Sequence, residues 1–231
     1  MNKTLLFTII FVLFGMVVLQ AQDVRYGVRA GLNYSQIGGF SFDKVYIEAP
    51  DTPDEVPNET AETPDGFEDN RIGFVIGFFA DYYFNEKFSI QPEIQFSNQG
   101  NKYEELRVNA LQLPIVFKYH ISDYINVHLG PEVGFKIWEW EKNENFGTFL
   151  FSGTVGVGVN ITDNFYVNLR YAIGLNDLFE DEAEIIVSRD TQVERIIDGQ
   201  PTTITITDRN TRIRNLEGKS SYFQLSFGYR L

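Results

Sequence analysis

In the stretch RIGFVIGFFADYYF, residues 71–84, every second side chain is bulky or apolar. The positions between them include Gly73, Gly77 and Asp81. Such an alternation of period two is typical of a β-strand. A soluble barrel packs its bulky side chains inside. Small and polar residues inside, with bulky residues outside, are instead typical of a barrel surrounded by lipid. The outward set is Ile72, Phe74, Ile76, Phe78, Ala80, Tyr82 and Phe84.

The same alternation recurs along the chain and is equally clear in the C-terminal segment. There the outward set is Phe223, Leu225, Phe227, Tyr229 and Leu231. Read between turns, the sequence predicts eight strands: 24–35, 71–84, 87–98, 108–121, 125–138, 148–161, 165–175 and the C-terminal segment. Their connections alternate between short and long, as in outer-membrane barrels. We therefore predict an all-β fold, a closed antiparallel eight-stranded transmembrane β-barrel with long surface loops.

Three prolines lie inside these predicted strands, at positions 92, 114 and 131. Proline donates no hydrogen bond, and a closed barrel has no free edge on which that loss would be harmless. Each proline should therefore mark a bulge or a local break in the ladder.

The N-terminus carries the features of an export signal. Lys3 provides a positive charge, an apolar run follows from Leu5 to Leu19, and Ala21 offers a cleavage point. The run is shorter than the roughly 20 residues of a membrane-spanning helix, which disfavours an uncleaved anchor. We predict a signal peptide over 1–21, a barrel domain over 22–231, and export to the outer membrane of a diderm bacterium.

Composition excludes several classes of function. The chain has no cysteine, so a lipid-modified cysteine, a disulfide or a cysteine-ligated metal is ruled out. A formal net charge of −13 argues against nucleic acid as a partner. We expect no cofactor.

Charged residues of both signs are predicted to face the lumen. An eight-stranded barrel is only wide enough to be filled by its own side chains. Opposite charges in so narrow a space are best explained as a paired, hydrogen-bonded structural network. The alternative is a narrow channel for ions or protons. The network residues are Arg29, Asp81, Glu93, Lys118, Glu132, Lys136, Arg170 and Arg230.

An enzyme is the weaker hypothesis, because no spacing in the chain matches a known catalytic signature. The two histidines, His120 and His128, are both predicted to face the lumen. We expect two hydrogen-bonded histidines in a filled lumen; a metal site formed by them with Glu132 is the alternative. We predict no catalytic residue and no metal ligand.

The first long connection, residues 36–70, is strongly acidic. Between Asp43 and Asp69 it holds ten acidic residues and one basic residue, with four prolines interspersed. Such a segment buries too little apolar surface to fold, so we expect a mobile surface loop. Calcium binding is an alternative, although the segment lacks an EF-hand-like ligand series.

The last long connection, residues 176–220, has a different character. Residues 184–197 and 202–207 are rich in β-branched residues on either side of Asp198-Gly199, which predicts a hairpin extending the barrel wall. If this hairpin reached into the bilayer, the barrel would have ten strands. Its apolar residues would be exposed unless they met a partner, for example through strand addition. They are Ile185, Val187, Val193, Ile204 and Ile206.

Several short segments resemble the PorT-like family of small outer-membrane β-barrel proteins. They are GVRAGLN at 27–33, QPEI at 91–94, LPI at 113–115, LGPE at 129–132 and FQLSFGY at 223–229. The resemblance implies the same barrel fold and, through the founding member, a link to protein secretion and sorting.

We therefore expect a non-enzymatic outer-membrane barrel that acts through its loops or as a component of an envelope assembly. An envelope enzyme or a narrow channel is the alternative. The expected partners are outer-membrane lipid, the barrel-insertion machinery through the C-terminal strand, and other envelope proteins.

Overall fold

The computed structural model describes residues 23–49, 52–57, 65–137, 146–180, 183, 185–197 and 200–231. Within these ranges, only the backbone is described for 44–49, 52–57, 186–197 and 200–212. The expected signal peptide, residues 1–21, lies outside the described residues.

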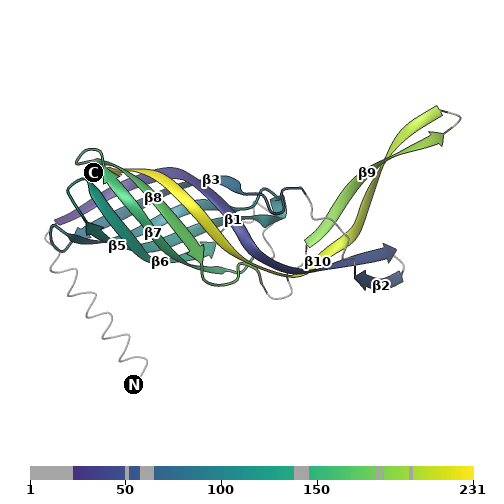
Figure 1. Ribbon diagram of the computed structural model, residues 1–231, viewed down its shortest axis with the longest axis horizontal. Coiled ribbons are helices and arrows are strands. Elements are labelled where there is room, and N and C mark those ends of the chain that lie inside the picture. The colour runs from purple at the N-terminus through teal and green to yellow at the C-terminus, as the bar shows by residue number, and fades with distance from the viewer. Residues whose placement is uncertain are drawn as a thin grey trace, which may run out of the picture.

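Eight antiparallel strands form a closed barrel (Figure 1). Around the wall they follow the order β1, β3, β4, β5, β6, β7, β8, β10, and pairing of β10 with β1 closes the ring. The predicted fold class is confirmed. The barrel strands are β1 (Asp23–Ala49), β3 (Arg71–Tyr83), β4 (Phe88–Gly100), β5 (Arg107–His120), β6 (Ile125–Lys136), β7 (Phe149–Asn160), β8 (Phe165–Gly174) and β10 (Gln200–Arg230).

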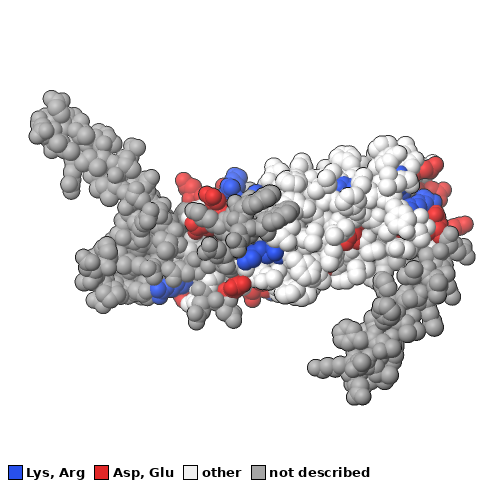
Figure 2. Space-filling view, turned by 180° about the vertical axis from the view of Figure 1, so that it is seen from behind, with Lys and Arg blue, Asp and Glu red and all other residues white. Residues whose placement is uncertain are grey.

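The alternation predicted from residues 71–84 is present in β3. Phe74 and Phe78 are 51% and 65% exposed on the outer wall, whereas Phe79 and Asp81 are buried in the lumen. Figure 2 shows the consequence: a mostly uncharged wall lies between two ends where charged side chains gather. Such a belt matches a hydrocarbon layer rather than water.

The three strand prolines interrupt the ladder without shifting its register. Beside Pro92, pairing of β3 with β4 lapses between Phe79↔Glu93 and Tyr82↔Ile90. Pairing of β4 with β5 lapses beside Pro114, and pairing of β5 with β6 lapses beside Pro131. In each gap the two strands skip the same number of residues, so the register is the same on both sides. These are therefore local breaks and not bulges.

Beyond the barrel, the two strands of the closing seam continue as an arm. β1 stays paired with β10 as far as Tyr46↔Thr211. β2 (Thr52–Pro57) adds to β1, and β9 (Ile185–Ile197) adds to β10 on the edge that β8 occupies lower down. Figure 1 shows the β9–β10 ribbon and the β1–β2 hairpin projecting from the same end of the barrel. We call this end the loop end, and the opposite end the turn end.

The arm corrects the expectation for the acidic connection, residues 36–70. Its first part is not a loop without regular structure, because β1 runs through it to Ala49. Backbone pairing with β10 needs no apolar burial, and Phe67 in the same connection is 1% exposed. Composition alone missed both effects. The ribbon of β9 lies outside the wall, so the barrel has eight strands and not ten.

Helical structure is minor. A single turn of 3₁₀-helix, Glu104–Leu106, precedes β5. Among the residues that the structure describes, no helix is long and apolar enough to span a membrane.

Candidate functional site: the lumen and its two ends

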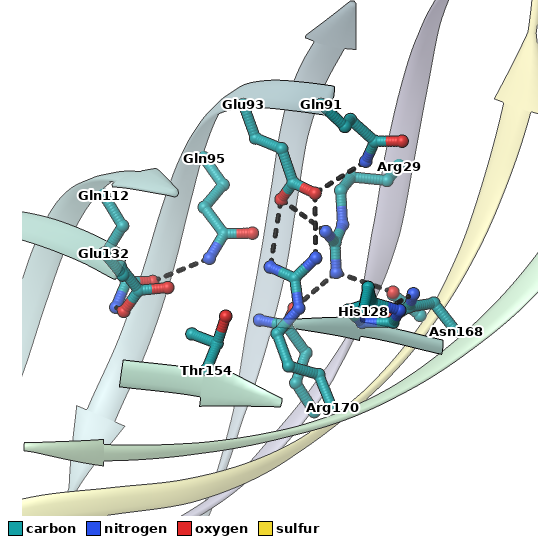
Figure 3. Close-up of polar contacts among 12 residues, drawn as sticks. Arg29, Gln91, Glu93, Gln95, Gln112, His128, Glu132, Thr154, Asn168 and Arg170 are labelled. Carbon is teal, nitrogen blue, oxygen red and sulfur yellow. Dashed lines mark hydrogen bonds and ion pairs between the residues drawn. The ribbon is translucent and has the colours of Figure 1, made fainter. Parts of the chain in front are cut away.

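The centre of the lumen is an ion triad formed by Arg29 on β1, Glu93 on β4 and Arg170 on β8 (Figure 3). Arg170 donates to both carboxylate oxygens, with Nη2 2.8 Å from Oε1 and Nη1 3.1 Å from Oε2. Arg29 donates to Oε2 from the other side. All three side chains are fully buried. The Glu93 carboxylate therefore links β4 to both β1 and β8 across the lumen.

Amides and hydroxyls extend the triad into neighbouring strands. Gln91 Nε2 donates to Glu93 Oε1 at 2.6 Å. Arg29 also donates to Gln224 and, at 2.8 Å, to Ser226 Oγ on β10. The closing seam between β1 and β10 is thus cross-linked from within the lumen.

A second ion pair lies nearer the turn end. Lys118 Nζ on β5 is 2.8 Å from Asp81 Oδ2 on β3 and also donates to Gln91. Gln91 therefore connects this pair to the triad through Glu93. Five of the eight predicted network residues are brought together in this way: Arg29, Asp81, Glu93, Lys118 and Arg170.

Glu132 lies apart from these ion pairs and has neutral direct partners. Both carboxylate oxygens accept from the Tyr222 hydroxyl, at 2.7 and 2.8 Å. Gln112 Nε2 donates to Glu132 Oε1 at 2.6 Å, and Gln112 Oε1 in turn accepts from Gln95 Nε2 at 3.0 Å.

The other two predicted network residues lie at the ends of the lumen. Lys136 Nζ donates to the carbonyl oxygen of Phe146 at the loop end. Arg230 donates to Asn160 Oδ1 at 2.8 Å at the turn end and stacks on the Tyr166 ring, 4.9 Å from its centroid. Neither belongs to the central network.

The two histidines face the lumen but do not gather around Glu132. His120 Nε2 is 3.0 Å from Ser89 Oγ, and its ring stacks on Tyr83. His128 lies between Asn126 and Asn168, at 3.3 Å from each. Within the described ranges no three acidic or histidine side chains are placed to hold a metal ion.

An apolar cap closes the lumen at the loop end, and sequence reasoning missed it. Its aromatic centre is Phe146, stacked on Phe179 with ring centroids 5.0 Å apart, and Phe67 beside Phe40 at 5.1 Å. Phe67, Phe146 and Phe179 lie in connections that are polar overall, where no sustained alternating pattern reveals them. Cap residues are Ile37, Phe67, Leu106, Val108, Ala110, Phe146, Leu150, Leu178, Phe179, Ala183, Ile185, Ile213 and Leu216.

Tyr103 packs on the edge of this cap, 5.8 Å from Phe67 between ring centroids. Burial, followed by the charges of Glu105 and Glu104, raises the pKa of Tyr103 to about 12. The hydroxyl therefore remains neutral at physiological pH.

The turn end is open by comparison. A cavity of about 570 Å³ is lined there by the short turns and by Arg25, His120 and Arg230. It does not continue through the barrel, because the ion pairs and then the cap lie beyond it.

The predicted residues of the last hairpin separate into two groups. Ile185 is 1% exposed and belongs to the cap. Val187, Val193, Ile204 and Ile206 lie in β9 and β10, where the backbone pairing is described but side-chain positions lie outside the described residues.

Fold and lumen together define an integral outer-membrane β-barrel whose interior is filled by its own side chains. The chain belongs to the family described as outer membrane protein beta-barrel domain, whose model matches residues 20–180. Comparison with curated proteins finds no match.

Solved structures of small barrels are similar to this chain at low identity. Ail, the attachment invasion locus protein of Yersinia pestis, is 12% identical, with 91% of this chain and 100% of Ail covered and a TM-score of 0.42. Neisserial surface protein A is 8% identical, with 91% and 100% covered and a TM-score of 0.43. OprG of Pseudomonas aeruginosa is 10% identical, with 90% and 95% covered and a TM-score of 0.40.

Proposed function

We propose that this barrel neither conducts solutes nor catalyses a reaction, and that it acts through the arm at its loop end as a component of an envelope assembly. The observation that carries the proposal is the closure of the lumen at two successive levels. The Arg29–Glu93–Arg170 triad fills the middle, and the apolar cap covers the loop end. Because the lumen is closed, partners would meet the protein at the arm, which projects beyond the barrel.

The lengths of the connections support an orientation for this arm. Outer-membrane barrels have short turns toward the periplasm and long loops toward the exterior. We therefore place the arm outside the cell and the 570 Å³ cavity in the periplasm. Cleavage of the signal peptide near Ala21, and insertion through recognition of the C-terminal strand, belong to the same proposal.

The two outer edges of the arm differ in a way that favours β9 as the edge that meets a partner. β2 has six residues, and two of them are prolines, a composition typical of edges protected against further pairing. β9 has thirteen residues and no proline. A partner strand from another envelope protein could add to β9, with Val187, Val193, Ile204 and Ile206 nearby. The PorT-like resemblance makes a protein-secretion assembly the favoured setting.

Co-purification tests the proposal. A tagged chain is extracted from its native outer membrane in mild detergent, beside a variant in which residues 188–209 are replaced by a short turn. We expect the full chain to retain an envelope protein at near-equal amounts and the variant to lose it. Partners that survive replacement of the arm, or a barrel that is always alone, would contradict this function. A heat-modifiable band on gels confirms that the variant barrel is folded.

A further inference from the structure

Two bulges mark the level at which the closing seam leaves the barrel and becomes the arm (Figure 1). β1 and β10 change register twice there and then return to their original register, because each strand carries one extra residue. The extra residue lies between Gly38 and Ser41 on β1, and between Arg214 and Glu217 on β10. Bulges bend a strand and interrupt its ladder. The seam can therefore bend here more easily than in the regular ladder on either side.

Each bulge contains a residue in the left-handed backbone region, Gly39 with a φ of 67° and Asn215 with a φ of 53°. Glycine adopts this conformation freely, and asparagine tolerates it better than most residues do. Asn215 Nδ2 also donates to Asp43 Oδ2 at 2.8 Å, which links the two strands of the seam. The seam thus combines the backbone geometry of a hinge with a side-chain bond that holds the hinge in one position.

The bulges also invert which residues of each strand face inward. On the barrel side the odd-numbered residues of β1 are buried, and Ile37 is the last of them, 1% exposed. Beyond it the even-numbered Phe40 and Phe42 pack against the cap. On β10 the buried residues change in the same way, from Leu216 to Ile213. The hinge segments therefore build one side of the cap themselves.

The rest of the cap comes from other connections, and it contacts the hinge through rings and backbone. Phe67 lies 5.1 Å from Phe40 and 5.7 Å from Phe42 between ring centroids. The backbone nitrogen of Leu178, in the connection that follows β8, donates to the carbonyl oxygen of Gly218 at 2.9 Å. Bending at the bulges moves Phe40 and Phe42 relative to Phe67. A change in the direction of the arm therefore breaks contacts of the cap.

We propose that the arm and the cap are coupled through this hinge, so that a partner that displaces the arm opens the cap. The proposal rests on the proposed function, because the partner has to act on the arm. Such a partner must bind the displaced arm more tightly than the arm in its present direction. Opening the cap exposes its apolar residues at the loop end, while the Arg29–Glu93–Arg170 triad still fills the lumen. The result is a new surface outside the barrel and not a pore.

Pulsed electron paramagnetic resonance on the purified chain in lipid vesicles tests the coupling without a partner. The chain has no cysteine of its own, so two spin labels can be attached at chosen sites. Gly153→Cys labels the wall, where an added Cβ meets nothing within 4 Å, and Gln192→Cys labels β9 in the arm. Phe67→Ala disturbs the cap without changing the seam, and Phe117→Ala, on the exposed outer wall, is the matched control. We expect a narrow distribution of distances in the parent and the control and a broader one in Phe67→Ala.

The reverse measurement uses the reciprocity of coupling between two sites. Val108→Cys places a thiol inside the closed cap, where Val108 is 0% exposed. Asp43→Ala removes the bond to Asn215 and should raise the rate of maleimide labelling about 2- to 10-fold, the effect expected of one hydrogen bond. Glu86→Ala removes an exposed carboxylate at the turn end and should leave the rate unchanged.

Two results would overturn the proposal, provided that a heat-modifiable band shows the variants to be folded. One is the same distribution of distances in the parent chain and in Phe67→Ala, whether narrow or broad, because the cap would then have no influence on the arm. The other is an unchanged labelling rate in Asp43→Ala. Neither result decides the proposed function, which is tested separately by co-purification of a partner.

Discussion

The carboxylate of Glu93 balances two fully buried guanidinium groups, so it should be the least replaceable side chain of the lumen. Glu93→Gln keeps the volume but leaves Arg29 and Arg170 without a counter-charge. Removing one partner of a buried ion pair costs about 3–5 kcal/mol. We expect a loss of that size in the free energy of unfolding, measured by urea titration in lipid vesicles.

A matched surface pair serves as the control for Glu93→Gln. Arg25 and Asp23 form an ion pair 2.9 Å long, with both side chains about half exposed. Arg25→Gln should cost about 1 kcal/mol or less, as is usual for exposed pairs. Equal losses for the two variants would show that the triad is not a structural centre.

Gly228 on β10 leaves room for an aromatic ring in the lumen. A Cβ at this position would lie 2.1 Å from the Tyr166 ring, which is 3% exposed and stacked with Arg230. We expect Gly228→Ala to destabilise the barrel by about 1–3 kcal/mol through overpacking. In a double-mutant cycle, Tyr166→Ala should relieve much of this loss. Additive losses would mean that the cost arises elsewhere.

At the scale of elements, the cap should be separable from the wall. Phe146 is fully buried and stacked on Phe179. Phe146→Ala should loosen the connections at the loop end, while strand pairing in the barrel persists. Limited proteolysis of intact vesicles should therefore cut the loop end faster, with the heat-modifiable core unchanged. Phe223→Ala, which changes an exposed residue of the outer wall, should leave proteolysis as in the parent chain.

The strands could be predicted from the sequence because alternation reports directly on the two sides of a membrane-spanning wall. Every predicted boundary of β3 to β8 lies within two residues of the observed one. The inward orientation of Arg29, Glu93 and Arg170 followed from the same parity. Their meeting at one point did not, because contacts across the lumen depend on strand tilt and side-chain reach.

The arm and the cap show where such reasoning fails. β1 continues past the membrane with a register shift between Gly38 and Ser41, where the alternation is lost. Phe67, Phe146 and Phe179 come from three separate connections, and only the folded barrel mouth brings them together. These connections are polar in overall composition, so their few apolar residues were not recognised as a cluster.

For the whole molecule, the two levels of closure should act in series. The parent protein in planar bilayers should show no steady conductance. Arg29→Ala with Glu93→Ala and Arg170→Ala removes the triad and leaves none of its three charges unpaired, yet the cap should still block the lumen. We expect conductance only when Phe146→Ala and Phe179→Ala are added. Steady conductance in the folded parent protein would instead favour the narrow-channel alternative.

The proline breaks have a mechanical consequence. They lie on adjacent strands: pairing is missing between β3 and residues 91–92 of β4, between β4 and residues 113–114 of β5, and between β5 and residues 130–131 of β6. Because the register is kept, these gaps form one oblique crease in an otherwise continuous cylinder. The wall should flex along this line and let its cross-section become elliptical without unzipping. Amide protons beside the crease should therefore exchange with deuterium sooner than those of β7 and β8, whose mutual pairing is uninterrupted.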